Sequence, residues 1–121
     1  HIGSVLLSIQ SLLNENPLHN EPGFEEEKGE RNDLYNIVVE HDNYSHLILN
    51  NGFKIHPLIA PLEPIIKEHL KREKDNIIKR LDVLSKKHPK PAKVTPNIYN
   101  ISMPIYYPSL KGELSCRLEE L

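Results

Sequence analysis

The sequence predicts a mostly helical fold, and three features lead to this prediction. A regular apolar stripe with helical spacing covers residues 62–87. Two further stretches, residues 4–13 and 34–50, repeat apolar residues with a similar period. Proline-rich segments separate these stretches, and proline does not continue a helix. At 121 residues the chain amounts to one domain or part of one.

The opening stretch predicts a buried helix capped by Gly3-Ser4. Its apolar residues cover more than one face of the helix: Val5, Leu6, Ile9, Leu12 and Leu13. An apolar surface of this width is too broad for a helix that lies on a protein surface. We therefore expect the helix to run through or across a hydrophobic core.

The next region predicts an acidic, exposed segment followed by a second helix. Residues 24–33 are rich in glutamate and hold no apolar residue after Phe24. Asn32 or Asp33 is the expected cap of a helix that runs from Leu34 to about Asn50. Asn-Gly at residues 51–52 is the expected stop, because glycine readily ends a helix.

The clearest helix is expected from Leu62 to about Lys87. Three prolines make residues 53–64 a rigid connector, and the last of them, Pro64, suits the first turn of a helix. The apolar stripe that should dock this helix consists of Leu62, Ile66, Leu70, Ile77, Leu81 and Leu84. Glu63 and Lys67 are one of several oppositely charged pairs four residues apart. Pro89 is expected to end the helix.

The C-terminal region is expected to be extended first and helical later. Residues 90–93 predict a short linker, and residues 94–108, with three prolines and three tyrosines, predict an extended strap. A last amphipathic helix is expected over residues 110–121. Its apolar face would hold Leu114, Leu118 and Leu121.

Composition excludes several classes of function. A net charge of −2 argues against a general nucleic-acid binder. The single cysteine, Cys116, rules out an internal disulfide and fits a reducing compartment, so we expect a cytoplasmic protein, with the nucleus as a further location. The apolar run at residues 5–13 is too short to span a bilayer, and we expect no membrane association.

The histidines do not predict a metal site. The densest group of metal-ligand residues is Glu40-His41-Asp42 with His46. His41 and His46 lie five residues apart and therefore on different faces of a helix, unlike the pair of a zinc-binding helix. We expect solvated histidines, no metal and no cofactor.

Two neighbouring strings carry a resemblance to a known family. Residues 4–13 read S-V-L-L-S-I-Q-S-L-L, and residues 16–25, here called the proline loop, read N-P-L-H-N-E-P-G-F-E. In this order they resemble the segment that follows the active site of ubiquitin-conjugating enzymes. The N-E-P-G-F-E string is most similar to the Z-type branch and to the giant BIR-repeat conjugating enzyme. The resemblance is strong over residues 2–25 and fades to a helical pattern over residues 33–87.

The resemblance implies a fold. The chain would be the C-terminal helical half of the α+β ubiquitin-conjugating enzyme fold, whose antiparallel sheet comes from the N-terminal part. Residues 1–88 would hold the crossover helix, the gate loop and the trailing helices. Residues 89–121 would form a family-specific C-terminal extension.

The resemblance also implies an activity. The family carries ubiquitin or a ubiquitin-like modifier as a cysteine thioester and passes it to lysine, and its partners are the modifier, an activating enzyme and a ligase. The family's H-P-N and C-L strings do not occur in this chain. Cys116 lies far downstream in the predicted last helix, without a catalytic context. We therefore expect this chain to be inactive alone.

Five residues are candidates for the site. Asn20 falls on the family's gate position, where a polar residue orients the attacking lysine, and His19 is its neighbour. The alternative is that both only form hydrogen bonds within a turn. Ser4, Leu7 and Ser11 fall on the face of the crossover helix that contacts the modifier in the family, although Leu7 could equally be a core residue.

Two other readings of the chain stay open. The first is a non-catalytic module with a conjugating-enzyme-like fold that binds ubiquitin or a protein partner. The second is a helical adaptor unrelated to ubiquitin. A cysteine in an H-P-N…C-L context upstream of this chain would favour the enzyme, and its absence would favour the module.

Overall fold

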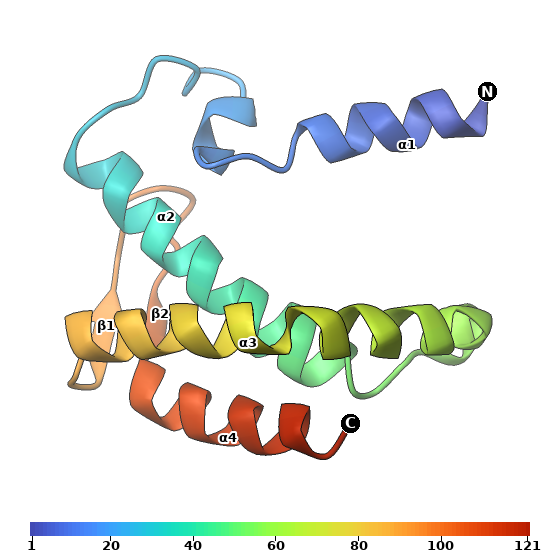
Figure 1. The fold of residues 1–121 in the computed structure, drawn as a ribbon. Coiled ribbons are helices and arrows are strands. Elements are labelled where there is room, and N and C mark those ends of the chain that lie inside the picture. The colour runs from blue at the N-terminus through green and yellow to red at the C-terminus, as the bar shows by residue number, and fades with distance from the viewer. The chain divides into compact units, whose positions relative to one another are not determined.

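A computed structural model describes residues 1–121, and most of them are helical (Figure 1). The mostly helical fold predicted from the sequence is therefore confirmed, while the complete conjugating-enzyme fold stays a prediction. The chain divides into two compact units. One unit comprises His1–Val39 and Val94–Met103, and the other comprises Glu40–Lys93 and Pro104–Leu121.

The first unit begins with helix α1, which spans Ile2–Ser11. The helix starts earlier than predicted, because the His1 side chain accepts a hydrogen bond from the backbone of Ser4 at 3.3 Å and acts as the cap. None of its residues is buried. The predicted core position of this helix is therefore not found within these 121 residues, where its wide apolar face stays exposed.

The rest of the first unit has a small core. A short 3-10 helix, η1, spans Pro17–Asn20 within the proline loop, and α2 spans Glu30–Asp42. The predicted start of this second helix at residue 34 is four residues late. Gly29 adopts a φ of 94°, a conformation that suits glycine, and the helix begins directly after it. The buried apolar residues of the unit are Leu18, Val38, Val94, Pro96 and Ile98.

The helical path continues past α2 as a π-helix, η2, over Asn43–Asn51. The end at Gly52 agrees with the predicted stop. The change from α to π was not predicted. A second 3-10 helix, η3, spans Pro57–Leu62 in the proline-rich connector.

The second unit is built on two packed helices, α3 over Glu63–Lys87 and α4 over Tyr107–Glu119 (Figure 1). The bounds of α3 confirm the prediction, and Pro64 lies in its first turn. Helix α4 begins three residues before the predicted start. The buried side chains of the two helices are Leu70, Ile77, Leu81, Leu84, Tyr107, Leu110, Leu114 and Leu118.

An ion-pair cluster reinforces this helix pair. Asp82 on α3 accepts from Lys111 on α4 at 2.7 Å and lies 2.8 Å from Lys86 on its own helix. The two lysines lower the pKa of Asp82 to about 2. The predicted pair between Glu63 and Lys67 forms at 2.9 Å.

The remaining elements are two short strands, β1 over Ala92–Val94 and β2 over Met103–Ile105. They pair as a two-stranded sheet. The loop between them, residues 95–102, carries three non-glycine residues with positive φ: Asn97, Tyr99 and Asn100. No helix combines the length and the hydropathy that crossing a membrane requires.

Candidate functional site

The proline loop has a defined backbone geometry. Asn14 Oδ1 accepts from the backbone of Asn16 at 2.8 Å, and Pro17 then opens the 3-10 helix. Leu18 is fully buried and anchors the loop. Asn16 also accepts from the buried Asn32 of α2 at 3.3 Å. The loop is therefore tied at its start both to the core and to α2.

The second half of the proline loop is a β-turn. The backbone of Phe24 donates to the carbonyl of Glu21 at 3.1 Å, with Pro22 and Gly23 between them. Gly23 has a φ of 90°, so proline followed by a left-handed glycine gives a type II turn. Glu25 Oε2 accepts from the backbone of Gly23 at 3.0 Å and closes the turn. This geometry explains the Glu-Pro-Gly-Phe order of the sequence.

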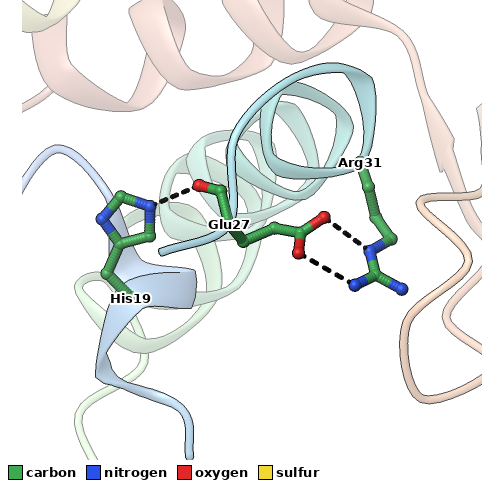
Figure 2. A network of polar contacts seen from close by, with 3 residues as sticks. All are labelled: His19, Glu27 and Arg31. Carbon is green, nitrogen blue, oxygen red and sulfur yellow. Dashed lines mark hydrogen bonds and ion pairs between the residues drawn. The ribbon is translucent and has the colours of Figure 1, made fainter. Parts of the chain in front are cut away.

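Both gate candidates hold backbone atoms of neighbouring segments. His19 Nε2 donates to the carbonyl of Glu27 at 2.7 Å (Figure 2). Asn20 Nδ2 donates to the carbonyl of Leu12 at 2.8 Å, just beyond the end of α1. Asn20 is exposed, and this bond uses only its amide nitrogen. The amide oxygen, which can accept two further hydrogen bonds, is not used in that contact.

A charged and aromatic pair follows the loop. Arg31 donates through Nε and Nη2 to the two carboxylate oxygens of Glu27, at 2.9 and 3.0 Å (Figure 2). This bidentate bond lowers the pKa of Glu27. The same guanidinium lies 5.1 Å from the centre of the Phe24 ring, which places a cation over an aromatic face. Glu27 therefore links His19 to Arg31, and Arg31 links Glu27 to the turn.

Tyr99 closes the site from a distant part of the sequence. Its ring meets the Phe24 ring edge-on, with 5.9 Å between the centres. Its hydroxyl donates to Glu21 Oε2 at 3.4 Å. The contacts thus form a continuous set around the proline loop, supplied by residues 12–31 and by the loop between β1 and β2.

One face of helix α1 combines small serine side chains with Leu7. Ser4, Leu7 and Ser11 lie on one side of the helix by their spacing, and all three are exposed. The hydroxyl of Ser11 donates back to the carbonyl of Ser8 at 2.6 Å, and that of Ser8 donates to the carbonyl of Ser4 at 2.9 Å. Leu7, with 67% of its surface exposed, is therefore not a core residue within these 121 residues.

The remaining sequence candidates belong to the second unit. Cys116 is exposed on α4, and its thiol donates to Glu120 Oε1 at 3.8 Å, so its partner is a carboxylate rather than an imidazole base. No group of three or more metal-ligating side chains gathers in the structure. His46 is exposed beside Asp42, as expected, but the expectation of a solvated His41 is wrong, because His41 is buried.

Sequence reasoning missed three members of the site: Glu27, Arg31 and Tyr99. The spacing of Glu27 and Arg31, four residues apart with opposite charge, is a signal that could have found the first two. Tyr99 gives no such signal, because its partners lie 75 and 78 residues away in the chain.

Comparisons with known proteins support the family over part of the chain. No protein-family model matches it. Proteins named ubiquitin-conjugating enzyme E2 Z from Danio rerio and Homo sapiens are 56% identical to it over 43 residues. Those residues are 34% of this chain but only 13% and 12% of the two relatives, which are much longer proteins. The protein of that name from Rattus norvegicus gives the same identity over the same length.

Part of this chain is similar to Z-type ubiquitin-conjugating enzymes. The predicted resemblance is therefore confirmed at partial coverage.

Proposed function

We propose that this chain is the part of a Z-type ubiquitin-conjugating enzyme that follows the catalytic cysteine. The complete enzyme would carry ubiquitin or a ubiquitin-like modifier as a cysteine thioester and transfer it to a lysine amine. The observation that carries this proposal is the 56% identity over 43 residues to proteins named as Z-type conjugating enzymes. The activating enzyme and a ligase would be its partners, in the cytoplasm and the nucleus.

The geometry of the proline loop supports a gate role for Asn20. Transfer to lysine needs a polar group that orients the incoming amine while water is excluded. Asn20 is held by one amide hydrogen bond to Leu12, and its second functional atom, the amide oxygen, can accept from an amine. A polar group fixed in this way loses little entropy when it meets its substrate.

The surface of α1 supports contact with the modifier. The serines at positions 4, 8 and 11 leave a shallow surface, because the hydroxyls of Ser8 and Ser11 bond to the helix itself. Leu7 is the large apolar side chain beside them. In the proposed enzyme, Leu7 would contact an apolar patch of the modifier.

The wide apolar face of α1 would be covered by another part of the complete enzyme. Relatives are much longer than the matched segment, so a covering surface can lie outside these 121 residues. Val5 and Ile9, both more than half exposed here, would then be core residues. The division into residues 1–88 and a family-specific extension at 89–121 stays part of the proposal.

A charging experiment tests the proposal. The full-length protein that contains this chain is incubated with activating enzyme, ATP and ubiquitin, and the products are separated with and without reductant. We expect a reductant-sensitive adduct, and none with the 121-residue chain alone. Binding of ubiquitin without an adduct would instead support the non-catalytic module. An adduct on the chain alone that disappears in Cys116→Ser would contradict the proposal.

Asn20 can be tested with two matched variants. Asn20→Ala removes both the bond to Leu12 and the polar group, and we expect a loss of about 1–3 kcal/mol in transition-state stabilisation for lysine discharge. Asn20→Asp cannot donate to Leu12 but keeps an acceptor for the amine, so its transfer rate should lie between those of the parent and Asn20→Ala. Charging should be nearly unchanged in both variants. Equal losses in the two variants would reduce Asn20 to a turn residue.

A further inference from the structure

We propose that Tyr99 is a positioning residue for the gate. Carried on the loop between β1 and β2, it holds the proline loop, and with it His19 and Asn20, in one conformation. This inference rests on the proposed function, because the gate role of Asn20 belongs to it. It adds a residue that neither the family motif nor the sequence reasoning points to.

The contacts of Tyr99 are directed at one target. Its ring packs edge-on against Phe24, and its hydroxyl donates to Glu21, so both ends of the side chain meet the type II turn. Glu21 directly follows Asn20 in the chain. Phe24 also contacts the guanidinium of Arg31, which in turn binds Glu27. Removing Tyr99 therefore removes two contacts of the turn, while the contact between Phe24 and Arg31 stays.

The backbone of Tyr99 gives an independent indication. Its φ is 51°, in the left-handed region that a bulky aromatic residue rarely adopts, and Asn97 and Asn100 have φ values of 59° and 55°. Asparagine tolerates this region, whereas tyrosine is strained in it. Tyr99 is nevertheless 61% exposed, so burial in a core does not explain why tyrosine occupies the position. Strained residues of this kind persist where the side chain has a specific use.

The left-handed backbone of Tyr99 allows an experiment that separates the side-chain contacts from the stability of the fold. Tyr99→Gly removes the ring and hydroxyl but suits the left-handed backbone, so the thermal unfolding midpoint of the protein should not fall. Lysine discharge by the full-length protein should nevertheless slow, by roughly tenfold or more, because a misplaced polar group loses its alignment with the amine. Tyr99→Phe keeps the contact with Phe24 and loses only the hydroxyl, so its rate should lie between those of the parent and Tyr99→Gly.

The matched control is Asn100→Gly, which introduces glycine at another left-handed position of the same loop without removing a contact to the turn. Its discharge rate should equal that of the parent. Charging by the activating enzyme should be unchanged in every variant, so that the loss is confined to the transfer step. A Tyr99→Gly protein that discharges at the parental rate would overturn the proposal.

Hydrogen exchange in the same full-length proteins separates this inference from the proposed function. Peptides that cover residues 18–27 should exchange faster in Tyr99→Gly than in the parent and in Asn100→Gly. If no thioester forms in any protein but the exchange differs, the proposed function fails while Tyr99 still holds the loop. If the thioester forms and exchange of residues 18–27 is the same in all variants, Tyr99 does not position the loop.

Discussion

At the scale of single residues, His41 is a buried titratable group of the second unit. Its Nε2 accepts from the backbone of Tyr106, the cap of α4, at 3.4 Å, so the proton of the neutral ring lies on Nδ1. Nδ1 is buried without a partner. The Tyr107 ring stands edge-on at 5.0 Å, and burial lowers the pKa of His41. The core therefore accepts the neutral imidazole and not the imidazolium.

This arrangement predicts that stability falls with acidification. Because the pKa of His41 is lowered in the folded state, the unfolded chain binds a proton first, at about pH 6.5. The free energy of unfolding should thus decrease as pH falls below that value, and level off below the folded pKa. Urea unfolding followed at pH 7.5 and pH 5.5 measures the change.

Two variants assign the pH effect to His41. Glutamine at position 41 can accept from Tyr106 without titrating, so His41→Gln should flatten the pH dependence. His46→Gln is the control, because His46 lies on the same helical stretch but is exposed and pairs with Asp42. A steep pH dependence that persists in His41→Gln would contradict the assignment.

Two residues show what the sequence could and could not predict at this scale. The burial of His41 was predictable, because His41 follows Val38 by three residues and shares its helix face. The left-handed conformation of Tyr99 was not predictable, because it depends on Phe24 and Glu21, which are distant in sequence. The type II turn lies between these cases, since the Pro-Gly pair predicts it locally.

At the scale of elements, the α3–α4 pair is the main source of buried apolar surface. Leu114 is fully buried on α4, and Leu81 is fully buried on α3. Leu114→Ala should therefore lower the free energy of unfolding by about 2–5 kcal/mol, since it removes apolar contacts and leaves a cavity. Urea unfolding at neutral pH measures this loss.

Val83→Ala is the control for that substitution. Val83 lies on α3 with 52% of its surface exposed, and alanine favours the helix more than valine does. Its effect should stay within about 0.5 kcal/mol. If the two variants lost the same stability, the apolar stripe would not be what holds the helix pair together.

The elements were predictable where one apolar stripe decides the structure, as in α3, whose bounds at Glu63 and Lys87 follow from proline and periodicity. The elements were less predictable where the hydrogen-bond pattern, and not the apolar spacing, distinguishes one type of helix from another. The π-helix at Asn43–Asn51 bonds each residue to the fifth before it, and apolar spacing does not distinguish this from an α-helix. Helix starts were also missed. His1 is not a preferred capping residue, and Gly29 adopts a left-handed conformation that more commonly ends a helix than precedes one.

At the scale of the whole molecule, the exposure of α1 is the most consequential feature. The sequence predicted the helix and the width of its apolar face, but not that the face would lack a cover within these residues. Leu6 and Leu13 are 60% and 80% exposed. Each large apolar side chain left in water forgoes about 1.5–3 kcal/mol of burial, against a typical domain stability of about 5–15 kcal/mol.

We therefore expect the isolated 121-residue chain to self-associate through α1. Sedimentation velocity over a range of concentrations should show a monomer in exchange with larger species. The double variant Leu6→Gln and Leu13→Gln should shift the chain towards the monomer, because it removes apolar surface from the helix without touching a buried residue. Leu58→Gln is the control, since Leu58 is 86% exposed but lies outside α1, and it should associate as the parent does. A parent chain that stays monomeric at every concentration would show that the apolar face of α1 needs no cover, and would remove the reason for placing it against another part of the enzyme.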